Sequence, residues 1–158
     1  MADYAGAVTA IKARMVEQWK TGDLPRTPVV FQNASNAYDP SSDTDAPWVY
    51  FEVISSPTGG LRAAGSPGSL VWNYRGNIYA HVFYPINSGI DDVIAAAVAI
   101  GEIFRVKKFY DATEGCYVRT GIGPNGQGPS VDGGGSASDD GQWFRVTATI
   151  PFEYVHRG

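Results

Sequence analysis

Residues 70–85 read LVWNYRGNIYAHVFYP and predict a strand over residues 70–84. Its alternating side chains are apolar or aromatic on both faces, with Ile78, Ala80 and Val82 on one and Tyr79, His81 and Phe83 on the other. A strand of this kind lies either in the centre of a sheet or against a neighbouring subunit. Pro85 has no N–H to donate to a ladder and is expected to end the strand.

A helix is predicted directly after this strand. Ser88-Gly-Ile-Asp91 has the spacing of a capping box, and a second aspartate follows it, which suits the positive end of a helix. The helix is expected to run to about Arg105, with the adjacent cations Lys107 and Lys108 at its end. Its polar side is thin, so we expect it to lie deep in a core or at an interface.

Another helix is predicted near the start of the chain. Asp3 can cap its first turn and Gly22 can end it. Apolar residues recur at helical spacing and are expected to contact the core: Tyr4, Val8, Ile11, Met15 and Trp19.

Further strands are predicted on both sides of these segments. Residues 28–33, 48–54 and 116–122 read as strands. In the last strand the inward residues are Phe144, Val146, Ala148, Ile150 and Phe152, and the outward ones are Arg145, Thr147, Thr149 and Glu153. Because Pro151 cannot donate to a ladder, we expect the end of this strand at a sheet edge or a bulge.

Two glycine-rich segments separate the strands. Residues 55–69 are expected to form a long loop or a frayed hairpin arm, and residues 123–141 are too poor in apolar side chains to pack on their own. The order of elements predicts an α+β fold: a mainly antiparallel mixed β-sheet with two α-helices packed on one face, plus a long hairpin or loop arm. No linker or repeat divides the chain, so residues 1–158 are expected to form a single domain.

Composition and charge exclude several classes of protein. The net charge is −4 and no basic stripe is visible, whereas a protein that lives on duplex DNA would show one. The start, MADYAGAV, lacks the basic region and apolar core of a signal peptide, so we expect the chain to be made and kept in a cytoplasm. The longest apolar run, residues 93–101, is far below the ~20 residues that span a bilayer, and no membrane partner is expected.

The sequence offers no recognisable constellation for catalysis or metal binding. His81 falls inside a strand, and His156 is expected to be frayed because it lies near the chain end. Cys116 is alone and is expected to be a small buried hydrophobe. Residues 121–126 match G-x-G-x-x-G, but the prolines and glycines that follow prevent the helix that a dinucleotide site needs. We therefore expect no enzyme, no catalytic residue, no metal and no cofactor.

Three features favour a subunit of an assembly. The aromatic strand, the apolar second helix and the two long loops together give excess apolar surface with adaptable segments, as interfaces have. A lone domain with an unusually large core would explain the strand and the helix but not the loops.

Several motifs occur in order along nearly the whole chain. They are the helix that ends at Trp19, then Phe31-Gln-Asn33, Pro47-Trp-Val-Tyr-Phe51, the segment YRGNIYAHVFYP at 74–85, Asn87-Ser-Gly89 with a helix ending at Phe104, and GQWFRVTATIPF at 141–152. In this series the sequence resembles the small tail-terminator, or tail-completion, proteins of long-tailed bacteriophages and phage-like gene transfer particles. The segment 74–85 is the most specific part of the resemblance.

The resemblance implies a sheet with two helices and a ring, usually a hexamer, at the head-proximal tip of the tail. Such a ring stops tube polymerisation and offers a surface to the head. The implied partners are further copies of the chain, the tail tube protein and the head–tail connector protein, while DNA only passes through the lumen. The implied location is the virion tail, after assembly in the cytoplasm of the host bacterium. Candidate subunit and tail interface residues are Arg62, Trp72, Tyr74, Arg75, Tyr79, His81 and Phe83.

Two alternatives remain at this point. A neck or head-completion connector protein of similar fold would bind heads instead of tails. A carbohydrate-binding module would use exposed aromatic side chains, with Trp48, Trp72 and Trp143 as the stacking residues.

Overall fold

Two long strands form the spine of the computed structural model. β4 (Val71–Pro85) and β8 (Trp143–Arg157) each have 15 residues and pair antiparallel over their whole length. The structure describes residues 3–19, 27–34, 38–39, 42, 45–56, 59–133 and 142–158. β4 lies between β2 and β8, so the strand predicted from residues 70–84 is central in the sheet.

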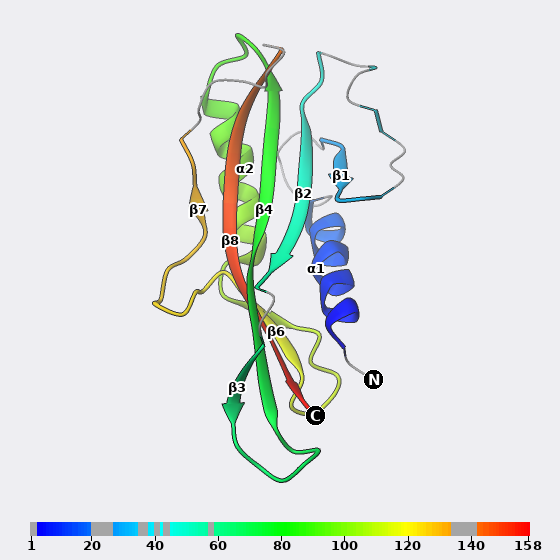
Figure 1. Ribbon diagram of the computed structural model, residues 1–158. Coiled ribbons are helices and arrows are strands. Elements are labelled where there is room, and N and C mark those ends of the chain that lie inside the picture. Colours follow the sequence, from blue (N-terminus) through cyan, green and yellow to red (C-terminus); the bar gives the residue numbers. More distant parts are fainter. Residues whose placement is uncertain are drawn as a thin grey trace.

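The remaining strands flank this spine in the order β1-β2-β4-β8-β6-β5 (Figure 1). β1 (Val29–Phe31) is parallel to β2 (Trp48–Ser55), and the other pairs are antiparallel. Beyond the end of β2, the short strand β3 (Gly60–Ala63) pairs with the first residues of β4. On the other edge of β8 lie β7 (Ser130–Val131), then β6 (Tyr117–Thr120), which carries β5 (Lys107–Phe109). The predicted mainly antiparallel mixed sheet is confirmed, and β3 with the start of β4 forms the predicted hairpin arm.

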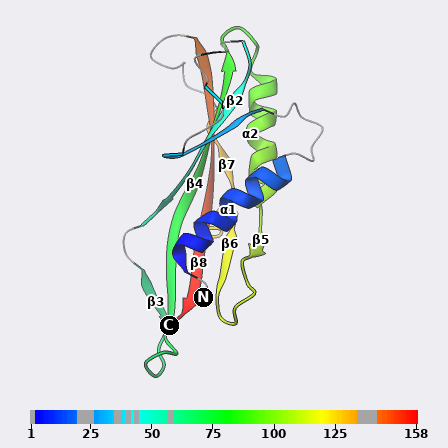
Figure 2. The ribbon, with the colours of Figure 1, turned by 90° about the vertical axis from the view of Figure 1, so that its right-hand side faces the viewer.

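Both helices, α1 (Tyr4–Trp19) and α2 (Asp91–Phe104), cover one face of the sheet (Figure 2), as predicted. In α1 the predicted cap is present, because Oδ1 of Asp3 accepts a hydrogen bond of 2.6 Å from the Gly6 N–H. The predicted apolar stripe faces the core, where Ile11 and Met15 are fully buried. Gly22, expected to end this helix, lies outside the described residues.

The start of α2 differs from the prediction. Its N-cap residue is Ile90, and no side chain caps the helix. The N–H of Ser88 instead donates to the Pro85 carbonyl in a turn, so the predicted capping box is wrong because Ser88 lies two residues too early. Asp91, in the first turn, still meets the positive end of the helix dipole.

The end of α2 also corrects the sequence interpretation. The helix ends at Phe104, Arg105 is extended with ψ 116°, and Val106 has a positive φ of 48°. This reversal sends Lys107 and Lys108 into β5, where they pair with Thr120 and Arg119. The two lysines therefore belong to an edge strand and not to a helix end.

The core lies between the helices and the inner face of the sheet. Alternate residues of three strands are buried there: Val49, Phe51 and Val53 from β2, Ile78, Ala80 and Val82 from β4, and Val146, Ala148, Ile150 and Phe152 from β8. The residues of β8 are those predicted to face inward. Phe104 of α2 stacks on Phe51 with ring centroids 5.9 Å apart, which joins the helix layer to the sheet. Cys116 is a buried free thiol, as expected.

Pro151 was expected near the end of the last strand, and this is wrong. β8 continues for six residues to Arg157, and the first four of these pair with β6 as well as with β4. The carbonyl of Pro151 accepts a hydrogen bond of 2.8 Å from Gly121, so its backbone faces away from β4. Pro151 thus lies between the residues of β8 that pair with β7 and those that pair with β6. At this position neither strand requires a backbone N–H from β8, so a proline is tolerated.

His156 was expected to be frayed and is instead part of β8. It pairs with Trp72, and its ring stacks on Tyr74 and Tyr154 at centroid distances of 5.6 and 5.5 Å. Tyr154 is 1% exposed, and its hydroxyl has no hydrogen-bond partner among the described residues. Burial, which disfavours the phenolate, raises the pKa of Tyr154 to about 12 from 10.0.

We expect Tyr154→Phe to leave stability unchanged or to raise it by about 1 kcal/mol at pH 7, because it removes a buried, unpartnered hydroxyl. The raised pKa also means that the stability given by neutral Tyr154 is complete below pH 10 and is lost as the pH rises towards 12. The substitution should therefore reduce the loss of stability above pH 10. Thermal unfolding of both proteins between pH 7 and 11.5 tests this, and a variant less stable than the wild type at pH 7 would contradict it.

Candidate functional site: an assembly surface on the open sheet face

The face of the sheet opposite the helices carries aromatic side chains. Trp48 stacks on Phe83 with centroids 4.2 Å apart and meets Trp143 edge-on at 6.1 Å. The imidazole of His81 lies between two partners, with Nδ1 2.8 Å from Thr147 Oγ1 and Nε2 3.1 Å from a carboxylate oxygen of Glu52. Figure 1 views the sheet from this side, and none of the described helices or strands crosses it. These side chains form the open face, on which Trp48, His81 and Phe83 are partly exposed and Trp143 is buried.

The lower part of the same face, beside the hairpin arm, holds a charged network. Glu153 is 6% exposed, and its Oε1 lies 2.7 Å from Nη2 of Arg119 and 3.7 Å from Nη1 of Arg62. Its Oε2 accepts a hydrogen bond of 3.0 Å from Asn73 Nδ2. Arg62 also donates a hydrogen bond of 2.8 Å to the Tyr117 hydroxyl. The carboxylate thus ties β8 to β4, β3 and β6.

The prediction that Glu153 faces outward is confirmed, but the side chain is only 6% exposed. The side chain does point away from the core face, but the neighbouring strands β4 and β6 cover it on both sides. Sequence reasoning also missed Asn73 and Arg119 as its partners. The signal that could have found them is a lone acid in the otherwise apolar run Ile150-Pro-Phe-Glu-Tyr-Val155, because a strand flanked by two others must pair such a charge.

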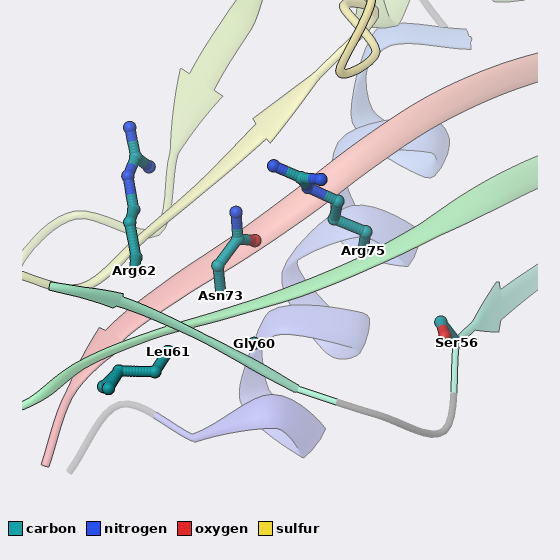
Figure 3. Close-up of a pocket in the computed structure, with 6 residues that line it drawn as sticks. All are labelled: Ser56, Gly60, Leu61, Arg62, Asn73 and Arg75. Atoms are coloured by element: carbon teal, nitrogen blue, oxygen red, sulfur yellow. The ribbon is translucent and has the colours of Figure 1, made fainter.

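An arginine hollow lies next to this network. It has a volume of about 310 Å³ and is lined by Ser56, Gly60, Leu61, Arg62, Asn73 and Arg75. Figure 3 shows the side chains of Arg62, Asn73 and Arg75 on one side of the two strands and that of Leu61 on the other. Arg75 is exposed and is the register partner of Glu153, and its guanidinium makes no hydrogen bond or ion pair with the described residues. The hollow therefore presents more positive charge than Glu153 neutralises.

A second hollow, of about 410 Å³, adjoins the first and shares Ser56 and Arg75 with it. Its other lining residues are mostly apolar and include Ile54, Tyr79, Pro124, Pro151 and Phe152. Ile54 is 47% exposed, which is unusual for an isoleucine in a strand. The two hollows form one continuous surface, basic at the arm and apolar towards the middle of the sheet.

The seven candidate interface residues divide between the two faces of the sheet. Five of them, Arg62, Arg75, Tyr79, His81 and Phe83, lie on the open face. Trp72 and Tyr74 are at even positions of β4, which point to the helix side. Tyr74 packs there against Tyr4 at 6.0 Å and Tyr154 at 6.4 Å. Its contacts make Tyr74 a packing residue of the chain's own fold.

The three tryptophans considered for carbohydrate stacking do not share one face. Trp48 and Trp143 lie together on the open face, and Trp143 is only 6% exposed. Trp72 belongs to the other end of β4 and to the opposite face. Within the described ranges no three His, Cys, Asp or Glu side chains gather as a metal-ligand set, and no helix is long and apolar enough to span a bilayer.

Comparison with known proteins adds a likeness of fold. No protein-family model matches the chain, and no curated protein does. Among solved structures 22 chains match, and one of these is 18% identical with a TM-score of 0.63, covering 97% of this chain and 96% of its own. The same α+β architecture therefore occurs in another protein over almost the whole length of both chains.

Proposed function

We propose that this chain is a structural subunit of a phage-like tail, a terminator that caps the tube at its head-proximal end. The observation that carries the proposal is the hairpin arm: β3 and residues 64–69 are exposed and project beyond both helices (Figure 1). Leu61 on this arm is 54% exposed and does not belong to the hydrophobic core that the described residues form. A protruding hairpin with an exposed leucine suits contact with another subunit.

The open face supports the same proposal. Its aromatic side chains are the residue types enriched at interfaces, and Trp48, Tyr50, Tyr79 and Phe83 are partly exposed. The architecture implied by the resemblance, a sheet with two helices, is the architecture observed. The motif 74–85, on which the resemblance mainly rests, forms most of the central strand.

The mechanism of termination follows from surface geometry. A growing tube ends in a ring of unsatisfied subunit surface, and each added ring recreates that surface. A terminator must bind this end and present a different surface on its other side. One sheet face with an arm can serve the first contact, while the helix layer presents unrelated side chains, among them Val98 and Glu102, to the opposite side. Partners in this proposal are further copies of the chain, the tube protein and the head connector.

Particles made without this chain are expected to carry tails of uncontrolled length or tails that do not join heads. Electron microscopy of particles from a strain with the gene deleted, beside a strain complemented with the wild-type gene, measures both properties. Normal-length tails attached to heads would contradict the proposal. Normal-length tails beside empty or leaking heads would assign the chain to the neck instead.

A further inference from the structure

The two ends of β4 carry complementary surfaces. At its start, the arginine hollow and the adjoining apolar hollow combine unpaired positive charge with exposed Ile54. At its end, a turn connects Pro85 to α2 and carries the opposite sign of charge. Because the two surfaces lie at opposite ends of one strand, they cannot meet within one copy (Figure 1).

The turn at the far end combines apolar and acidic side chains. Ile86 and Ile90 are 38% and 43% exposed, and Asp91 and Asp92 beside them are also exposed. The turn has a fixed backbone: Ile86 donates to the Gln142 carbonyl at 3.1 Å, and Gly89 has a φ of 85°, which suits glycine. A rigid turn of this kind loses little conformational freedom on docking.

We propose that the turn formed by residues 86–92 of one copy docks into the two hollows beside Arg62 and Arg75 of the next copy. This proposal rests on self-assembly under the proposed function and names the contact. The carboxylates of Asp91 and Asp92 meet the guanidinium groups, which bind carboxylates in a bidentate geometry. The isoleucines meet Ile54 and Tyr79 in the apolar hollow. A phosphate of DNA would satisfy the arginines but would leave the apolar hollow unfilled.

The contact is head-to-tail, because it joins two different surfaces of identical chains. Such a contact generates a ring where the rotation closes. It also predicts complementation: a copy with a defective hollow still has a working turn, and a copy with a defective turn still has a working hollow. In a mixture of the two variants, the working turn of one can dock into the working hollow of the other. The two surfaces left over are both defective, so no third copy can join.

The test uses Arg75→Gln, which removes the charge without placing a carboxylate opposite Glu153, and the pair Asp91→Lys with Asp92→Lys. Sedimentation over a concentration series, with and without tail tubes, is expected to show association of the wild type and a 10- to 100-fold weaker association of each variant. An equimolar mixture should form dimers of twice the 16.9 kDa chain mass. Lys107→Gln, which removes one exposed positive charge from the edge strand β5 outside both surfaces, is the matched control and should associate like the wild type.

Each of the other possible results would contradict one part of the proposal. Wild-type association that neither variant weakens would overturn the docking of this turn and leave the proposed function standing. Variants that are weak alone and make no dimers when mixed would overturn the head-to-tail contact. A wild type that is monomeric under all conditions would overturn self-assembly itself. Duplex DNA binding that Arg75→Gln abolishes, with association unchanged, would assign the hollow to phosphate.

Discussion

Gly76→Ala is expected to destabilise the fold by about 3 kcal/mol, a large part of the 5–15 kcal/mol that usually holds a domain together. Gly76 lies where β2 ends against β4, opposite Ser55 and Phe152. A Cβ there would meet the Ile54 carbonyl oxygen, and would lie 2.7 Å from Ser55 Cα and 2.8 Å from Phe152 Cε1. Two of these three atoms belong to the backbone of a paired strand, so they cannot move aside without breaking the ladder.

Gly60→Ala is the matched control for this substitution. Gly60 is also a strand glycine, on β3, and the nearest atom to a Cβ there is the Asn73 carbonyl oxygen at 3.9 Å. We expect a change within about 0.5 kcal/mol for this variant. Denaturant unfolding of both proteins measures the difference. Equal stabilities would show that the close approach of β2 to Gly76 is absent in solution.

Phe104→Ala is expected to cost about 3–5 kcal/mol and to lower the melting temperature by about 10 °C. The side chain is fully buried at the end of α2 and stacks on Phe51 of β2. Removing the ring leaves a cavity between the helix layer and the sheet. The hydrogen bond from the Thr120 hydroxyl to the Phe104 carbonyl, 2.8 Å long, should persist because it uses the backbone.

Phe83→Ala provides the comparison on the opposite face of the sheet. Phe83 is half-buried and stacks on Trp48, so its loss should cost clearly less stability than the loss of Phe104. If the open face is covered in an assembly, Phe83→Ala should instead weaken association. Calorimetry on the two variants measures the loss of stability, and sedimentation on the same variants measures the loss of association. A Phe83→Ala variant as unstable as Phe104→Ala would place Phe83 in the core.

Long periodic segments made most of the fold predictable. The alternation in β2, β4 and β8 and the apolar stripe of α1 each extend over many residues, and for β8 and α1 the residues predicted to face the core do so. The short strands β5 and β7 were not predicted. Three residues and two residues are too few for a period to show, and these strands exist because β6 and β8 offer them partners.

The candidate surface was predictable only in part. The aromatic odd positions of β4 were visible as a second apolar face, and they do lie opposite the helices. The network around Glu153 could not be predicted, because it depends on the register of the strands. That register places Arg75 of β4 and Arg119 of β6 on either side of the same acid. Register between distant segments is a property of the whole sheet. The arginine hollow could therefore be found only once the strands were aligned.

Arg75 and the turn after Pro85 belong to the same uninterrupted strand, and this has a geometric consequence. Ten residues of β-strand separate them, a distance of roughly 33 Å at about 3.3 Å per residue. Between these points β4 is hydrogen-bonded to β8 on one side and largely to β2 on the other, so the distance cannot stretch or shorten. The spacing between successive copies, and hence the bore of a closed ring, would then be set by the length of one strand rather than by any loop.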